Sequence, residues 1–178
     1  MDELSMQITI PDSLEKLPMY ETENDLSLSK RMELIALMNQ RLGCAIDLQM
    51  QMKQAHWNVK GPSFIALHEL FDKVAEAVES YVDLIAERIV QLGGVAEGTV
   101  RMSASVTRLT EYPLSTSSGM AHIEVVARAL STFGQSARMT IDEVGELEDA
   151  DSADIFTEIS RGIDKWLWFV EAHSQASS

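Results

Sequence analysis

Apolar residues recur every three or four positions along four long stretches of this sequence, a spacing typical of amphipathic helices. The stretches cover residues 27 or 29 to 57, 63–92, 119–148 and about 154–173. The pairs Gly61-Pro62 and Gly93-Gly94 follow the first two and interrupt the helical pattern. Only 4 Pro and 9 Gly occur in 178 residues, so the residues that usually form turns between strands are scarce. An all-α fold is therefore expected.

A long connection separates the second and third stretches. Residues 95–118 contain Gly98, Pro113 and many Ser and Thr, with room for one short helix at about 103–110. A connection of this length lets the chain cross over, so that the next helix runs parallel to the second one. Four long helices with one crossover predict a four-helix bundle, in which Ser63 is a candidate N-cap of the second helix.

Charge and apolar spacing divide the chain into three parts. Residues 1–26 hold seven acids against Lys16 as their one base, without a helical period, which predicts an extended acidic arm. The bundle is expected over 27–173 as one domain, followed by a short tail at 174–178. The formal net charge of -14 has the wrong sign for binding phosphates, so general nucleic-acid binding is disfavoured.

The sequence carries few signals for a compartment other than the cytoplasm. Cys44 is the single cysteine, which excludes an intramolecular disulfide and a C-x-x-C zinc site. No apolar run reaches the roughly 18 residues of a membrane span, and Met1-Asp2-Glu3 lacks the basic start of a signal peptide. A cytoplasmic protein without membrane partners is expected.

Four candidate metal ligands share one face of the second helix. His68 and Asp72 are four residues apart, as are Asp83 and Glu87, so the members of each pair meet. Positions 72 and 83 differ by about 20° around the axis but lie about 16 Å apart along it, too far for one metal centre. A two-fold axis between the pairs would set the first pair of one subunit beside the second pair of another. The spacing thus predicts a site shared by two subunits, to which His56 can add a third arm.

The ligand types narrow the choice of metal. Imidazole together with carboxylate suits iron or zinc rather than calcium, and the residues themselves accept both metals. Bundles that hold di-iron within one chain carry Glu-x-x-His on two helices. The residues three before the four histidines are instead Lys53, Ile65, Gly119 and Val170. This absence favours a site between subunits.

Several motifs around these ligands resemble the Dps family of mini-ferritins. They are His56-Trp57-Asn58-Val59-Lys60-Gly61, Leu67-His68-Glu69-Leu70-Phe71-Asp72, Asp83-Leu84-Ile85-Ala86-Glu87-Arg88 and Lys165-Trp166-Leu167-Trp168-Phe169. The resemblance extends from about Leu34 to Glu171. It implies a ferritin-like four-helix bundle.

The resemblance also implies a function and an assembly. Dps proteins form hollow dodecamers that oxidise Fe(II), commonly with hydrogen peroxide, store the ferric mineral inside and thereby protect against oxidative stress. Their ferroxidase centre lies at the dimer interface. Its counterparts in this sequence are His56, His68 and Asp72 of one subunit, facing Asp83 and Glu87 of the other. A di-iron site is therefore expected, with a zinc-occupied structural shell as an alternative.

Two further regions gain an interpretation from the family. Trp57 adjoins a ligand position, where it can intercept radicals or anchor an interface. The acid-rich turn before the fourth helix would line an iron-entry pore at a three-fold axis, or it is simply a solvated face. The candidate pore residues are Asp149, Asp151 and Asp154.

The acidic arm departs from the family members that bind DNA. Those members use tails rich in Lys or Arg, whereas residues 1–26 are acidic and 174–178 add no base. Because there are no counterions to release, direct DNA binding is expected to be weak or absent. A DNA-binding protein that compacts the nucleoid is the alternative function.

Other polar residues receive ordinary interpretations. His122 and His173 lack partner motifs and are expected at the surface or as caps. Lys53 and Arg88 lie near ligand positions, where they can balance the carboxylates or form ordinary surface ion pairs, the simpler expectation. Cys44 falls within the apolar pattern of the first helix and is expected to be buried.

Overall fold

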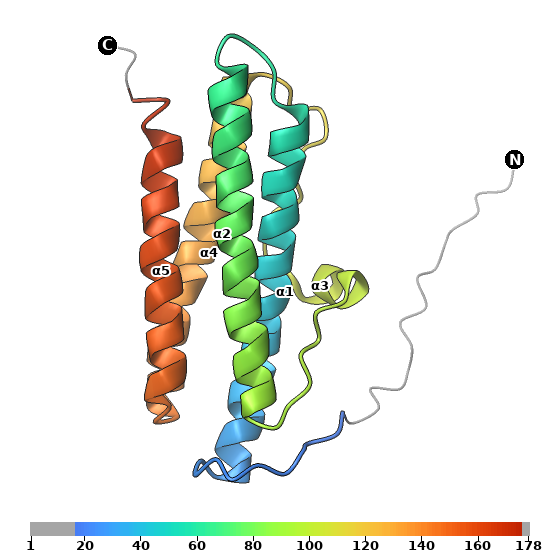
Figure 1. The fold of residues 1–178 in the computed structure, drawn as a ribbon, viewed down its shortest axis with the longest axis vertical. Helices are drawn as coiled ribbons and strands as arrows, with labels where there is room; N and C mark the ends of the chain where they lie inside the picture. The colour runs from blue at the N-terminus through green and yellow to red at the C-terminus, as the bar shows by residue number, and fades with distance from the viewer. Residues whose placement is uncertain (1–16, 176–178) are drawn as a thin grey trace, which may run out of the picture.

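The computed structural model describes residues 17–175; residues 1–16 and 176–178, with most of the predicted arm and part of the predicted tail, lie outside the described residues. The described chain forms five helices and no strand, and the all-α prediction is confirmed. The four long helices form a bundle in which α1 packs mainly on α2, and α4 on α5 (Figure 1). The helices are α1 (Leu28–Asn58), α2 (Phe64–Gln91), α3 (Val100–Val106), α4 (Gly119–Glu146) and α5 (Ala150–Glu171).

The connection between α2 and α4 crosses the length of the bundle. In Figure 1 it leaves α2 at the bottom of the view, passes α3 and reaches the start of α4 at the top. The backbone N–H of Gly119 donates to the carbonyl of Lys60 at 3.2 Å, which ties the start of α4 to the turn between α1 and α2. The helix α4 therefore runs parallel to α2, as the length of the connection predicted.

Two helices begin earlier than predicted because capping side chains determine their first residues. The helix α3 lies three to four residues before its predicted position, because the Thr99 hydroxyl accepts a hydrogen bond from the Met102 N–H. The helix α5 begins at Ala150 rather than at 154, because the Asp149 carboxylate caps it. Ser63 occupies the N-cap position of α2, but its side chain makes no capping hydrogen bond.

One apolar core lies between the four long helices and also encloses polar groups. Its largest side chains include Phe71, Phe133 and Phe156, and Cys44 is buried as predicted. Some charged or titratable side chains lie in the same interior and need partners there. None of the described helices has an apolar stretch long enough to cross a membrane.

The described part of the predicted arm, residues 17–26, contains no helix. It is tied to the end of α2, where the Tyr20 N–H donates to the Gly93 carbonyl at 2.8 Å. Gly93 has a φ of 84°, a conformation that favours glycine and ends α2.

Candidate metal centre

His56 and His68 lie face to face where α1 ends and α2 begins. Their rings stack with centroids 3.7 Å apart and planes inclined by 20°. The Nδ1 atom of each ring lies 2.8 Å from the backbone oxygen of the other histidine. The chain reverses between them because Val59 is extended and Gly61 has a φ of 115°.

These two hydrogen bonds define the tautomer of each ring. A carbonyl oxygen can only accept, so each Nδ1 carries a proton and donates it. In neutral His56 and His68 the Nε2 atom then keeps its lone pair, and it is the atom that can bind a metal. Metal-binding histidines are commonly held in this way through their other ring nitrogen.

Asp72 adds a carboxylate one turn further along α2. Its Oδ1 atom lies 2.5 Å from Lys53 Nζ and 3.9 Å from His56 Nδ1. The hydrogen bond from Lys53 holds the pKa of Asp72 below its usual 3.8, against a smaller opposing effect of burial. Asp72 is therefore anionic at neutral pH. The surface ion pair expected of Lys53 is present, and its partner is a candidate ligand.

Asp83 and Glu87 make up the other half of the predicted site, and both are exposed on α2. The rise along a helix places Asp83 about 16 Å from Asp72. Within residues 17–175, no three His, Cys, Asp or Glu side chains are grouped so that they could hold a metal ion. A single subunit thus presents two separate groups of candidate ligands.

Trp57 lies beside this group and faces outward. Its side chain is 58% exposed, and Lys53 Nζ lies 5.9 Å from the centre of its ring. Lys53, Trp57 and Asp72 line one surface hollow together with Met50 and Glu76. This position is compatible with either role expected of Trp57.

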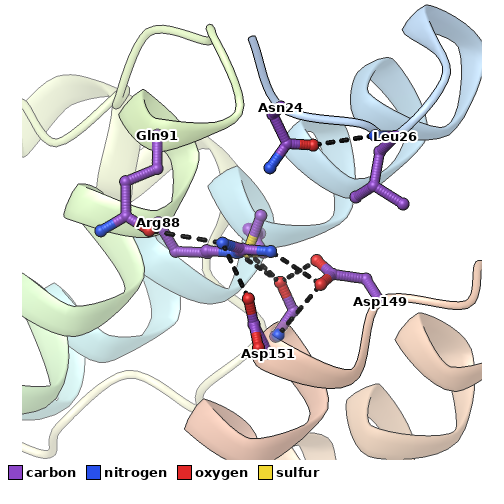
Figure 2. Close-up of polar contacts among 8 residues, drawn as sticks. Asn24, Leu26, Arg88, Gln91, Asp149 and Asp151 are labelled. Atoms are coloured by element: carbon purple, nitrogen blue, oxygen red, sulfur yellow. Dashed lines mark hydrogen bonds and ion pairs between the residues drawn. The ribbon is translucent and has the colours of Figure 1, made fainter. Parts of the chain in front are cut away.

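Arg88 and Asp149 form a buried ion pair between α2 and the start of α5 (Figure 2). Arg88 Nη2 lies 2.7 Å from Asp149 Oδ1, and the two side chains are only 7% and 4% exposed. Arg88 Nε also donates to the Ser152 hydroxyl at 3.1 Å, and that hydroxyl donates to Asp149. The surface pair predicted for Arg88 is wrong, because the side chain turns inward to a buried carboxylate.

This buried pair changes the interpretation of the acidic turn. Asp149 caps α5 and neutralises Arg88, so its carboxylate is not free to line a pore as predicted. Asp151 is 82% exposed, with a longer contact of 3.7 Å to Arg88 Nη1. Asp154 is also exposed. Of the three pore candidates, Asp151 and Asp154 keep carboxylates that face solvent.

His122 is fully buried, and its predicted place at the surface is wrong. Its Nδ1 atom lies 2.5 Å from the Tyr112 hydroxyl, and within the described chain its Nε2 atom has no hydrogen-bond partner. The apolar neighbour Ile123 was the available sign of burial. His173, by contrast, is exposed and contacts the Phe169 carbonyl at 2.9 Å, in agreement with its prediction.

Residues 35–176 match the ferritin-like domain, which covers most of the chain. The DNA protection during starvation protein of Agrobacterium fabrum is 42% identical over 159 residues, which cover 89% of this chain and 98% of that protein. The chain therefore belongs to the ferritin-like family, and the predicted ferritin-like four-helix bundle is confirmed.

Solved structures agree with this assignment. Dps from Mycobacterium smegmatis superimposes with a TM-score of 0.84 at 29% identity, covering 90% of this chain and 96% of that one. DpsA14 from Streptomyces coelicolor gives a TM-score of 0.84 at 30% identity, covering 90% and 95%. Within the ferritin-like family, the chain is a Dps mini-ferritin, as its motifs implied.

Proposed function

We propose that this protein is a ferroxidase and iron store that oxidises Fe(II) with hydrogen peroxide or dioxygen and protects against oxidative stress. The main support is the reciprocal bonding of His56 and His68, which leaves both Nε2 atoms free beside the ionised Asp72. Membership of the ferritin-like family supports iron as the substrate.

A second subunit completes the proposed centre. A two-fold axis across α2 would bring Asp83 and Glu87 of the partner subunit to His56, His68 and Asp72. The expected assembly is a hollow cytoplasmic dodecamer that encloses the ferric mineral. At its three-fold axes, the exposed carboxylates of Asp151 and Asp154 would concentrate Fe(II) and guide it inward.

The ligand charges favour oxidation at this centre. Anionic carboxylate oxygens stabilise Fe(III) more than Fe(II), so a site with three carboxylates lowers the free energy of the oxidised product. Two Fe(II) ions supply both electrons that hydrogen peroxide needs, giving two Fe(III) and two hydroxide ions. Hydroxyl radical is then not released.

The names of relatives raise direct DNA binding as a second function. Proteins from Agrobacterium fabrum and Mycolicibacterium smegmatis are called DNA protection during starvation proteins. The net charge of -14 and the acids of residues 1–26 oppose contact with phosphates in this chain. We expect protection through removal of Fe(II) and peroxide instead. Retardation of DNA in a gel shift at physiological salt would favour nucleoid compaction.

Anaerobic Fe(II) oxidation tests the ferroxidase proposal. The rate is measured after adding hydrogen peroxide, and separately in air, while light scattering sizes the particle. The double variant His56→Ala/His68→Ala should oxidise Fe(II) no faster than buffer and keep the assembly. His173→Ala is the matched control, because this exposed histidine bonds only within its own helix turn, and it should keep the wild-type rate.

Two outcomes would contradict the proposal. An unchanged rate in His56→Ala/His68→Ala would show that these residues are not the site. Wild-type protein that oxidises Fe(II) no faster than buffer, while zinc competes successfully with Fe(II) for the protein, would favour the zinc-occupied structural shell.

A further inference from the structure

A buried tyrosine and histidine form a hydrogen-bonded pair that the candidate metal centre does not use. Tyr112 lies in the crossover and His122 in the first turn of α4. Tyr112 is 6% exposed and His122 is fully buried. The phenol oxygen lies 2.5 Å from His122 Nδ1.

Packing connects this pair with the two chain segments that carry candidate ligands. The ring of His122 lies 6.3 Å, centroid to centroid, from the ring of Phe71, which precedes Asp72 in α2. The backbone of Asn58, two residues after His56, lies close enough to the His122 ring to raise its pKa, against the larger lowering by burial. The pair therefore adjoins both segments that carry the candidate ligands of one subunit.

Burial keeps both members of the pair neutral. It raises the pKa of Tyr112 well above the usual 10. It also lowers the pKa of His122, with the Asn58 backbone opposing this effect. Burial therefore opposes deprotonation of the phenol and protonation of the imidazole when each occurs alone. A proton can still pass between the two groups along the hydrogen bond.

The direction of the hydrogen bond follows from counting donors and acceptors. If the phenol donates to Nδ1, the proton of the neutral ring is on Nε2, which is then the one unsatisfied group of the pair within the described chain. If Nδ1 donated instead, both the phenol hydrogen and Nε2 would lack partners. The phenol of Tyr112 therefore donates to a basic nitrogen of His122.

We propose that Tyr112 and His122 act as a one-electron store for the ferroxidase centre, an inference that rests on the proposed function. A lone Fe(II) converts hydrogen peroxide into Fe(III), hydroxide and hydroxyl radical. The hydroxyl radical takes one electron from Tyr112 and becomes hydroxide, while the phenol proton moves to His122 Nδ1. This leaves a neutral tyrosyl radical beside an imidazolium.

The next Fe(II) returns the store to its starting state. It gives one electron to the tyrosyl radical, and the proton moves back from His122 to the phenol oxygen. The sum is two Fe(II) and one peroxide giving two Fe(III) and two hydroxide ions. The store thus lets two irons that arrive separately consume one peroxide without releasing a radical.

The other two tyrosines of the chain lack this arrangement. Tyr20 is 60% exposed, and no histidine partner is found for it among residues 17–175. Tyr81 is buried, and no hydrogen bond from its hydroxyl to a histidine is found among residues 17–175; burial and the charge of Glu158 both raise its pKa. Loss of an electron from a phenol is easiest when a base takes the proton at the same time. This singles out Tyr112 and makes the other two tyrosines useful controls.

Rapid-freeze electron paramagnetic resonance on the assembled protein tests the store. One Fe(II) per centre is mixed anaerobically with excess hydrogen peroxide. A tyrosyl signal, narrowed by ring-deuterated tyrosine, should form in wild type and persist in Tyr20→Phe/Tyr81→Phe, where Tyr112 is the only tyrosine. The signal should be lost in Tyr112→Phe and kept in its matched control, Tyr81→Phe.

A substitution of the histidine separates proton transfer from packing. His122→Gln keeps a hydrogen-bond acceptor for the phenol but removes the base, so the tyrosyl signal should be lost although Tyr112 remains. Hydroxyl radical caught by a spin trap should rise in both Tyr112→Phe and His122→Gln. A purely structural role of His122 would leave the signal unchanged in every His122→Gln sample that folds.

Several results would overturn the store. One is a tyrosyl signal that survives in Tyr112→Phe, and another is its absence from Tyr20→Phe/Tyr81→Phe, where misfolding around Tyr112 is not an explanation. Oxidation with saturating Fe(II) is measured on the same samples. Fast oxidation without a tyrosyl signal in wild type would overturn only the store, whereas oxidation no faster than buffer would overturn the ferroxidase proposal with it.

Discussion

Two of the ion pairs that have a member on α2 lie in different surroundings. Lys53–Asp72 lies in a surface hollow, with side chains 29% and 37% exposed, next to two histidines with free Nε2 atoms. Arg88–Asp149 is buried, and Ser152 bonds to both of its members. The first carboxylate keeps oxygen lone pairs for a ligand, whereas the second uses its lone pairs inside the fold.

Under the proposed function, this difference separates a charge that binds a metal from a charge that holds the fold together. A charge that is to bind a metal has to stay partly exposed, and an exposed ion pair contributes little to stability. A charge that holds two helices together can be buried only when partners surround it, because an unpaired buried charge is very costly. Under the proposed function, two ion pairs that each have one member on α2 would therefore serve opposite purposes.

The largest effect is expected from breaking the buried pair. Asp149→Ala leaves Arg88 buried without its partner and removes the cap of α5, so the free energy of unfolding should fall by about 3–5 kcal/mol. Urea denaturation at neutral pH measures the change. Asp151→Ala is the matched control: this exposed neighbour also contacts Arg88, but its loss should cost less than about 0.5 kcal/mol. Equal losses in the two variants would contradict a structural role specific to Asp149.

A smaller effect is expected from His122, a buried group that stays uncharged. Because burial lowers its pKa in the folded state, the unfolded chain binds a proton more readily below its usual pKa of 6.5. The free energy of unfolding should therefore fall with pH below this value, by up to about 1.4 kcal/mol per pH unit, until the folded-state pKa is reached. Urea denaturation of wild type and His122→Phe, from about pH 7.5 down to about pH 5.5, measures the difference in slope.

The wild-type curve should be steeper than the curve for His122→Phe. Since the two proteins share every other titrating group, their difference isolates this histidine. Parallel curves would mean that His122 is protonated equally in the folded and unfolded states.

Much of the fold could be predicted because helical periodicity depends on residues close together in the sequence. The four long helices, the break at Gly61 and the parallel crossover follow from local spacing and from the length of one connection. The start of α5 was missed because it depends on a hydrogen bond from Ser152 to Asp149, not on apolar spacing.

The candidate site could be predicted only in part, because local spacing shows which residues share a helix face but not which distant segments meet. His68 and Asp72 lie on one face of α2 because they are one helical turn apart. Arg88 turns inward because Asp149, 61 residues away, meets it there. His122 is buried against Tyr112, whose place is decided by the path of the crossover. A local pattern does not show contacts that join distant segments, so the buried partners of Arg88 and His122 could not be predicted.

The smallest change in stability is expected from the exposed pair. Lys53→Met should lower the free energy of unfolding by less than about 1 kcal/mol, because both side chains of the pair are partly solvated. Lys53 lowers the pKa of Asp72 in the folded state. The stabilisation from this ion pair is therefore fully present above the unfolded-state pKa of about 3.8 and is lost as pH falls through the folded-state value. The difference in free energy of unfolding between wild type and Lys53→Met should therefore be present at neutral pH and disappear in acid.

The same variant has a second consequence at the metal centre. In wild type, Lys53 holds Asp72 Oδ1 and places a positive charge where a cation would bind. Replacing it by Met frees the carboxylate, so Fe(II) should bind more tightly, most visibly at low ionic strength where charges are least screened. Anaerobic Fe(II) titration by calorimetry measures this, with Lys53→Arg as the control that keeps the charge. Weaker binding in Lys53→Met would mean that Lys53 positions Asp72 for the metal rather than competing with it, and the exposed pair would then be as structural as the buried one.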